Sequence, residues 1–411
     1  MFFYESHSVP NTNIRQLRAL VTVAKAENIS AAAVILGRSQ PAISQSIQGL
    51  ERDFSVILFT RTKSGVFLTQ AGQILTARAK TALGGIFKAV KEISNFDKKE
   101  CSRIANAIST VHLKSLIATV EHGGFAQAAR AENLAVPTVH RAARELEKIV
   151  GVVLFEKTSF GVQPTRAAVT LGAAGGRAFS EIRQARAEIA VLKGMEKGET
   201  VIGAMPLARA FLAPMAVMEF CARHRGHRIS IVEAPYEILI TDLARGRVDM
   251  LIGATRGGNC EMDVVEELVF EDVLSVLMRP EHPLASAPRL TSKRLAVFPW
   301  VAPRQSSPLR VHFDALFGQN LPPLDIVECN SLSAARVMLM NSDRLMLLSD
   351  AQAHMELDKG LITSRKPPGH TISRSISLTF RKNWRPTAAQ KQLVKTVRRI
   401  ASEGYGRVLI K

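Results

Sequence analysis

One predicted helix presents a row of side chains that could read the edges of DNA bases. Its outward positions hold amide and hydroxyl groups, with a proline in the first turn: Ser39, Gln40, Pro41, Ser44, Gln45 and Gln48. Ile43, Ile47 and Leu50 have the spacing of a buried stripe, so these polar groups point away from the core. A glutamine can form two hydrogen bonds with an adenine edge, and a serine can reach a base or a phosphate. The alternative is an ordinary solvated helix face.

Basic and hydroxyl side chains follow on a predicted hairpin. Arg61 and Thr69 lie on its two strands, around a turn that contains Gly65. Such side chains suit contact with phosphates, which positions a protein on DNA without specifying the sequence. Together with the polar helix face, they predict double-stranded DNA as a partner.

Three helices and the hairpin must hold these groups in place. Apolar spacing predicts a first helix around Leu17–Ala24 and a second that Asn28 or Ser30 can cap. Ser39 is a natural cap of the third helix, where Pro41 lies in the first turn and needs no N–H donor. Two short strands follow: Ile57–Arg61 and Val66–Thr69. This order of elements is a winged helix-turn-helix.

The same pattern recurs 96 residues later. Leu17–Thr69 aligns with Leu113–Thr165 without a gap and with 14 of 53 positions identical, where average composition gives roughly three. A duplication explains the match. The second copy has lost the polar helix face but has basic groups suited to the DNA backbone: Arg141, Arg144 and Lys157. A second DNA contact of low specificity and a purely structural, dimer-forming unit are both open.

Beyond residue 198, apolar strands alternate with helical patterns, which indicates an α/β fold with a largely parallel sheet. The predicted strands are Glu199–Met205, Arg228–Glu233, Val248–Gly253 and Glu267–Met278, and the predicted helices are Pro206–Arg225 and Tyr236–Gly246. Each winged unit is also followed by a long segment of helical periodicity: Ala71–Phe96 and Ala167–Leu192.

These motifs resemble the LysR-type transcriptional regulators. Matches to the DNA-binding domain of that family are Ala32-Ala33, Ser39-Gln40-Pro41-Ala42-Ile43-Ser44 and Leu68-Thr69-Gln70-Ala71-Gly72. Matches to its effector-binding domain are Val201–Pro206, Leu243–Gly253 and His282–Ala285. Phe298–Pro303 and the segment after Met205 are most similar to the subgroup of the galactose-binding-protein regulator and of regulators of aromatic-acid breakdown.

The resemblance implies a bacterial, non-enzymatic regulator whose DNA binding is modulated by a small-molecule co-inducer. It implies winged helix-turn-helix domains at residues 12–69 and 108–166, linker helices at 70–107 and 167–197, and an effector-binding domain at 198–405. The last has two lobes of the periplasmic-binding-protein type, residues 198–262 with 368–405 and residues 263–367. In the family the linker helix pairs with its twin. Here the pairing could be between chains, in a homo-oligomer such as a dimer or tetramer, or within one chain.

The resemblance also predicts where the effector binds. Family members hold an anionic ligand between the lobes with backbone N–H groups and hydroxyls at helix starts. The matching positions are Met205, Pro206, Tyr236, Ser306, Ser307, Asn330 and Ser331. They predict a carboxylate or sugar as the effector. Ordinary helix capping uses the same groups, so these serines could equally be caps.

Charge and cysteine content fit a soluble, cytoplasmic DNA-binding protein. Residues 1–200 hold 26 Lys and Arg against 16 Asp and Glu, and residues 351–411 hold 13 against 3. Residues 201–350 hold 15 against 17, so the positive charge lies at the two ends. A basic balance favours a polyanionic partner. The four cysteines have no CxxC spacing, and no apolar stretch reaches the length of a membrane helix. No metal, cofactor or membrane contact is therefore expected.

Catalytic motifs are missing from the sequence. It contains no P-loop, no HExxH motif and no nucleophile elbow, and the glycines around Gly175 lack GxGxxG spacing. Two alternatives stay open: a ligand-binding or enzymatic α/β protein, and an architectural DNA binder whose C-terminal half senses nothing.

Overall fold

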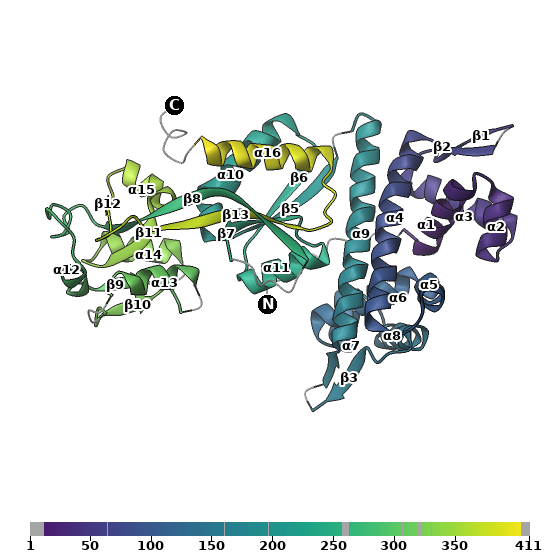
Figure 1. Cartoon of the computed structure of the whole chain (residues 1–411), viewed down its shortest axis with the longest axis horizontal. Coiled ribbons are helices and arrows are strands. Elements are labelled where there is room, and N and C mark those ends of the chain that lie inside the picture. The colour runs from purple at the N-terminus through teal and green to yellow at the C-terminus, as the bar shows by residue number, and fades with distance from the viewer. Residues whose placement is uncertain are drawn as a thin grey trace.

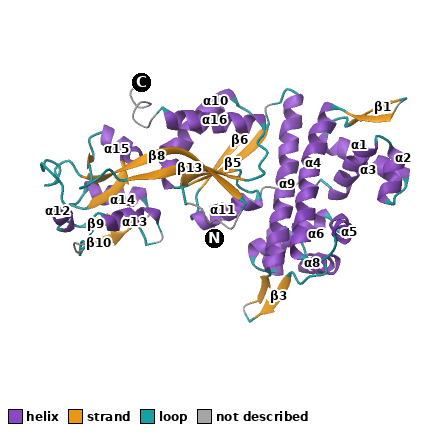
Figure 2. Cartoon of the chain, viewed as in Figure 1, coloured by secondary structure: helices purple, strands orange, loops and turns teal. Residues whose placement is uncertain are grey.

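The computed structural model of the chain separates a helical N-terminal part from an α/β C-terminal part (Figure 1). It describes residues 12–63, 65–159, 161–195, 197–256, 263–305, 307–318, 322–329 and 331–403. Two long helices, α4 (Gln70–Ile93) and α9 (Arg166–Leu192), stand side by side in the N-terminal part. Figure 2 shows the large sheet beyond α9, with α10 and α16 on one side of it and α11 on the other.

The first unit contains three helices and a hairpin, as predicted. Its elements are α1 (Ile14–Ala26), α2 (Ile29–Leu36), α3 (Gln40–Phe54), β1 (Phe59–Thr62) and β2 (Gly65–Leu68), and α4 follows. Asn28, not Ser30, caps α2 by accepting a hydrogen bond from the Ala31 N–H at 3.0 Å. Gly37 ends α2 at φ +61°, a conformation that favours glycine.

The second unit repeats this order. Its elements are α6 (Thr110–His122), α7 (Phe125–Ala131), α8 (Val136–Val150), β3 (Phe155–Thr158) and β4 (Gly161–Pro164), and α9 follows. The expected linker at 70–107 is two helices, since α4 ends at Ile93 and a separate α5 (Lys98–Ala107) begins after its cap Asp97.

Local hydrogen bonds recur at the 96-residue offset. The carboxylate of Glu51 accepts from the Leu58 N–H, and that of Glu147 from the Leu154 N–H, each at 2.9 Å. The hydroxyls that cap the two long helices also donate to the chain before the hairpin: Thr69 to Ile57 O at 2.7 Å and Thr165 to Val153 O at 2.9 Å. Both copies therefore hold their wing against the helices in the same way.

The two long helices pack against each other within one chain. One continuous core extends from Ile14 in the first unit to Ile189 in α9 and includes buried residues of α4, α6 and α8. Of the two pairing modes that the sequence left open, the structure has the intrachain one.

The C-terminal sheet is mixed rather than largely parallel. Its strands are β5 (Gly198–Ala204), β6 (His227–Val232), β7 (Met250–Ala254), β8 (Val264–Met278), β9 (Trp300–Ala302), β10 (Ile326–Glu328), β11 (Leu345–Ser349), β12 (Thr363–Arg365) and β13 (Ser373–Arg381). Their order is β10-β9-β11-β8-β13-β7-β5-β6, with β12 paired to β8. The strands at each end pair in parallel, but the central β8 and β13 are antiparallel to each other and to their neighbours. They run between the core of the second lobe and two smaller cores of the first lobe.

Helices cover both faces of this sheet. They are η1 (Ala208–Leu212), α10 (Ala213–Arg223), α11 (Tyr236–Arg245), α12 (Ser292–Ala296), α13 (Pro308–Ala315), α14 (Leu332–Met340), η2 (Asp350–Ala353), α15 (His354–Asp358) and α16 (Ala388–Ser402). The predicted helix Pro206–Arg225 begins as the short π-helical turn η1 and continues as α10.

The second long helix also supports the effector domain. Arg177 and Arg183 of α9 donate to the carbonyls of Ala244 and Gly246 at the end of α11. Gly176 lets the two elements approach closely, because a Cβ there would lie 2.4 Å from the Arg245 carbonyl oxygen. The contact places the first lobe directly against the paired helices.

Candidate DNA-binding surface and effector site

The outward face of α3 is polar, as the spacing predicted. Gln40, Pro41, Gln45 and Gln48 are exposed and Ser44 is half-buried, while Ile43, Ile47 and Leu50 are buried. Ser39 is the N-cap, and its hydroxyl accepts from the Ala42 N–H at 3.4 Å. The side chains of α3 that could reach base edges therefore lie together on one accessible face.

The two predicted wing residues differ in their availability. Arg61 is exposed on β1. Thr69 caps α4, where its hydroxyl accepts from the Gly72 N–H at 3.0 Å and donates to Ile57 O. The Thr69 hydroxyl thus has a structural task, and its contact with DNA stays a prediction.

The corresponding face of α8 is basic. Arg141 on α8 and Lys157 on β3 are exposed, whereas Arg144 forms an ion pair with Glu147 at 2.6 Å. The ring of His140 packs edge-on against Phe125, with centroids 5.1 Å apart. Ala135 provides no side-chain cap for α8. Two exposed cations and one paired cation therefore stand where the first unit has the polar face of α3.

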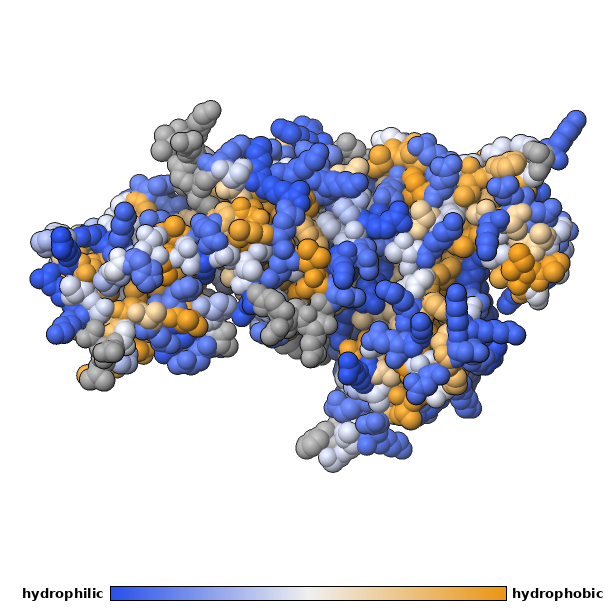
Figure 3. All heavy atoms as spheres, viewed as in Figure 1, coloured by the Kyte–Doolittle hydropathy of each residue, from blue (hydrophilic) through white to orange (hydrophobic). Residues whose placement is uncertain are grey.

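The units also differ at their second helix. Figure 3 shows apolar surface at the end of the molecule where α2 lies, and α2 exposes Val34 and Ile35 there. The matching positions of α7 are Arg130 and Ala131, both exposed.

A buried charged cluster that sequence reasoning missed joins α4 to α9. The guanidinium of Arg78 bonds Glu181 at 2.8 Å and Glu188 at 2.6 Å, and only 3% of the Arg78 side chain is exposed. Burial lowers the pKa of Arg78, but the hydrogen bonds to Glu188 and Glu181 outweigh it, so the pKa is raised. The signal in the sequence was an arginine placed within the apolar stripe of α4.

Other contacts between the units are also direct. The Ile14 N–H donates to Thr110 Oγ1 at 2.9 Å, although these two residues are equivalent positions of the repeat. Equivalent residues meet in this way near a twofold axis. Arg186 of α9 forms an ion pair with Asp53 at the end of α3 at 2.6 Å.

The first predicted effector residues lie at the ends of β5 and β6. Met205 is half-buried, its N–H donates to Ile252 O at 3.0 Å, and its side chain covers Gly253. Pro206 is exposed. Tyr236 is half-buried at the start of α11, with the Arg256 guanidinium 4.4 Å above its ring.

The remaining predicted effector residues belong to the second lobe. Ser307 caps α13 by accepting from the Leu309 N–H, and Ser331 caps α14 by accepting from the Ala334 N–H, both at 3.3 Å. Ser306 and Asn330 lie outside the described residues. Ser307 and Ser331 thus have the capping role, and their contact with a ligand stays a prediction.

Sequence reasoning missed a polar group where the lobes join. Arg374 of β13 donates to Asp272 at 2.9 Å and to Gln352 at 2.6 Å, and all three belong to elements shared by or adjoining both lobes. Burial raises the pKa of Asp272 against the opposing effect of Arg374. Burial and the charge of Arg374 lower the pKa of His312 on α13. The charge of Arg374 on β13 therefore acts on His312, which belongs to α13 of the second lobe.

Metal-ligand clusters and membrane-spanning helices are both absent from the described ranges. There, no group of three or more His, Cys, Asp or Glu side chains could hold a metal ion. None of the helices described is long and apolar enough to cross a bilayer.

Family models match most of the chain. The model of the bacterial regulatory helix-turn-helix protein, lysR family, matches twice, at residues 14–73 and 110–169. The LysR substrate binding domain model matches residues 193–402. The HTH-type transcriptional regulator GalR of Pseudomonas putida is 31% identical over 404 residues, which cover 95% of this chain and 98% of GalR.

Solved structures share the fold over a shorter span. ArgP from Mycobacterium tuberculosis is 15% identical with a TM-score of 0.55, and the match covers 71% of this chain and 96% of ArgP. CbnR complexed with its target DNA is 18% identical with a TM-score of 0.50, over 71% of this chain and 99% of CbnR. The chain therefore belongs to the LysR family of bacterial transcriptional regulators, whose members bind DNA through a helix-turn-helix and small effectors through their C-terminal domain.

Proposed function

We propose that this chain is a LysR-type regulator with two tandem winged helix-turn-helix domains, at residues 12–69 and 108–166, that bind two adjacent segments of DNA as an intrachain pair. The linkers at 70–107 and 167–197 join them to the effector-binding domain at 198–405, and the protein acts in the bacterial cytoplasm. The observation that carries the proposal is the packing of α4 against α9 in one core. The lengths of the matches support the proposal. ArgP and CbnR are matched over 96% and 99% of their length by 71% of this chain. The remaining part of this chain is long enough for one additional winged unit.

The charges between the long helices favour this pairing over pairing of identical helices. Arg78 in α4 corresponds to Ala174 in α9, and Glu181 in α9 corresponds to Gly85 in α4. A pair of two α9 helices would therefore bury Glu181 without the arginine that neutralises it here. A carboxylate buried without a cation is costly, so α4 with α9 is the favoured combination. Oligomers of the chain, dimers or tetramers, then form through other surfaces.

The two units have different tasks in this proposal. The first reads bases with Gln40, Ser44, Gln45 and Gln48, and Ser39, Pro41, Arg61 and Thr69 place that helix. The second binds the phosphate backbone with Arg141 and Lys157, and Arg144 contributes less because Glu147 holds it. The pair would thus bind an operator in which one half has a specific base sequence and the other half tolerates many sequences.

Footprinting on the DNA upstream of the protein's own gene tests this function. The full chain should protect two adjacent segments about one helical turn apart, as paired helix-turn-helix units do. Gln45→Ala should reduce the preference for the site over random DNA by about 1 to 3 kcal/mol, while the second segment is lost only together with the first. A single protected segment of half the length would contradict binding by both units.

We further propose that a carboxylate or sugar co-inducer binds between the lobes, residues 198–262 with 368–405 and residues 263–367, as in the subgroup that the sequence resembles. The residues involved are Met205, Pro206, Tyr236, Ser306, Ser307, Asn330 and Ser331. Support comes from the starts of α13 and α14, whose N–H groups favour an anion, and from Arg374 at the junction.

Calorimetric titration with candidate carboxylates and sugars tests the co-inducer. Ser307→Ala should weaken binding by about 1 to 2 kcal/mol, because one hydroxyl is lost and the N–H groups stay. Thr291→Ala is the matched control, since Thr291 caps α12 in the same lobe with a bond of the same length, 3.3 Å. Equal losses in both variants would assign the effect to capping alone.

A further inference from the structure

A cavity lies where the paired helices meet the first lobe. Its volume is about 890 Å³, and it is lined by α4, α9, the starts of β5 and β6, the end of α10 and the start of α16. No residue predicted to bind DNA or effector lines it. We propose that this cavity is a binding site for a small amphipathic anion, a carboxylate or sulfonate with an apolar body.

The size and apolar surface of the cavity suit a small molecule. Pockets for such ligands have volumes of about 300 to 1,000 Å³ and are mostly apolar, with a few polar groups that fix orientation. Ile74 of α4, Val191 of α9 and Ala389 of α16 provide apolar surface from three different elements. A ligand with an apolar body would therefore be enclosed from several sides.

The charge of the lining selects for an anion. Lys197, Arg223 and Arg385 are exposed cations on the lining, whereas Glu188, the only acidic lining residue among those described, is bonded to Arg78. The acceptors of the Arg385 guanidinium are the Ala77 carbonyl at 3.2 Å and the Thr81 hydroxyl at 3.1 Å, neither of them charged. A carboxylate or sulfonate could supply the missing negative charge.

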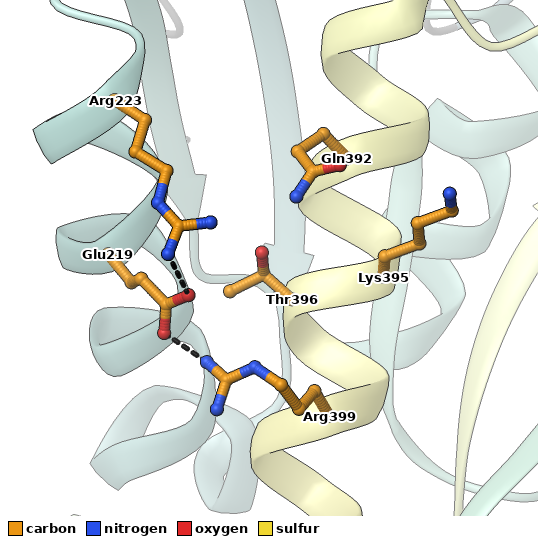
Figure 4. A pocket seen from close by; sticks show the side chains of 6 residues that line it. All are labelled: Glu219, Arg223, Gln392, Lys395, Thr396 and Arg399. Atoms are coloured by element: carbon orange, nitrogen blue, oxygen red, sulfur yellow. Dashed lines mark hydrogen bonds and ion pairs between the residues drawn. The ribbon is translucent and has the colours of Figure 1, made fainter.

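The adjoining hollow between α10 and α16 shows the contrast. Its volume is about 510 Å³, and Arg223 and Gln392 line both spaces. In Figure 4 the Glu219 carboxylate lies between Arg223 and Arg399, with ion pairs to both. Lys395 points away from that carboxylate. Glu219 thus pairs with Arg223 from the side of this hollow, whereas Lys197 and Arg385 of the cavity have no acidic partner among the described residues.

The place of the cavity makes its occupant relevant to regulation. Arg385 reaches from the effector domain to Ala77 and Thr81 of α4, and Arg78 of α4 donates to the Arg385 carbonyl at 2.8 Å. A bound anion would touch the DNA-binding pair and the first lobe at once. This site is separate from the one proposed between the lobes and does not depend on it.

Fluorescence titration of the full-length protein with anilinonaphthalene sulfonate, an amphipathic anion, tests the proposal. Lys197→Gln combined with Arg385→Gln should weaken binding about tenfold or more, because two charged partners are lost. Lys395→Gln is the control: it removes a cation of α16 that lines the adjoining hollow but not the cavity, and it should leave binding unchanged. Thermal melting verifies that each variant is folded.

A competition series identifies the chemistry. Octanoate should displace the dye from the wild-type protein, whereas octanol and octylamine, of the same chain length, should displace it at least about tenfold less well. Equal dye affinity in the double variant and the wild type, or displacement by octanol as effective as by octanoate, would overturn the proposal.

Discussion

The two winged units share their scaffold and differ in their exposed face. Glu51 and Glu147 hold the wing with bonds of equal length at the 96-residue offset. At the same offset, the first unit has Gln45 where the second has Arg141, and Gln48 where the second has Arg144. A glutamine can bond to one particular base, whereas an arginine on a phosphate binds DNA of any sequence. The fold of the unit is therefore kept while the residues on its exposed face change.

The difference extends to the surface that joins the units. In a pair of identical copies, every contact would occur twice. Here the ion pairs of Arg78 and Arg186 occur once, because the residues at their matching positions are Ala174 and Val90. The two units therefore contribute different charged groups to one interface within the chain.

The largest expected effect comes from breaking the charged cluster between the units. Arg78→Ala leaves Glu181 and Glu188 facing a buried interface without their cation, so the free energy of unfolding should fall by about 3 to 5 kcal/mol. Chemical denaturation measures the loss. Arg103→Ala is the control, because the Arg103 side chain is 71% exposed in its ion pair with Glu100, and it should cost far less than Arg78→Ala. Equal effects of the two changes would show that the cluster does not join the units.

The reading task of the first unit gives the next largest effect. Gln45→Ala should weaken binding to the specific site by about 1 to 3 kcal/mol and binding to random DNA far less, because a base contact is lost. Electrophoretic mobility shifts on both DNAs measure the difference. An equal loss on both DNAs would assign Gln45 to the backbone and remove the functional contrast between the units.

The second unit should respond to salt instead of sequence. Arg141→Ala should flatten the dependence of log K on log salt by about one charge and leave sequence preference unchanged. Arg144→Ala should have a smaller effect, since Glu147 already neutralises that cation. Binding titrations at several salt concentrations give the slopes. Unchanged slopes in both variants would make the second unit purely structural.

The smallest effect concerns the caps of the two third helices. Ser39→Ala should cost about 1 kcal/mol of stability, because the α3 N-cap loses its hydroxyl. Ala135→Ser should gain up to about 1 kcal/mol, because α8 has no side-chain cap. Thermal melting of both variants checks the opposite signs. A loss in both would mean that α8 begins in a geometry that cannot use a serine.

Local patterns predicted the N-terminal part well because its signals are local. A few neighbouring residues specify α3: the Ser39 cap, Pro41 and the apolar stripe. The same pattern occurs in the second unit, so each element was predicted from two segments of the sequence. The mixed sheet was missed because β8 is 15 residues long and its partners, β13 and β11, are distant in sequence. Strand direction there depends on tertiary pairing, which local patterns do not contain.

The sites show the same division. The outward direction of Gln45 followed from helical spacing, but the bond of Arg144 to Glu147 required the side-chain positions. Arg78 was hidden because a charged residue in an apolar stripe is ordinarily at its solvent edge. Its partners in α9 are more than one hundred residues away, and no spacing rule connects them.

Cross-linking distinguishes intrachain from interchain pairing of the units most directly. Asp53 and Arg186 form their ion pair across the units with side chains about one-third exposed, so cysteines at both positions can be bridged by a short bis-maleimide. A chain with both Asp53→Cys and Arg186→Cys should give an internal link that runs as a single chain on a denaturing gel. An equimolar mixture of the two single variants should give no linked pair of chains above the wild-type background. A strong two-chain product in that mixture, with no internal link in the double variant, would contradict the account.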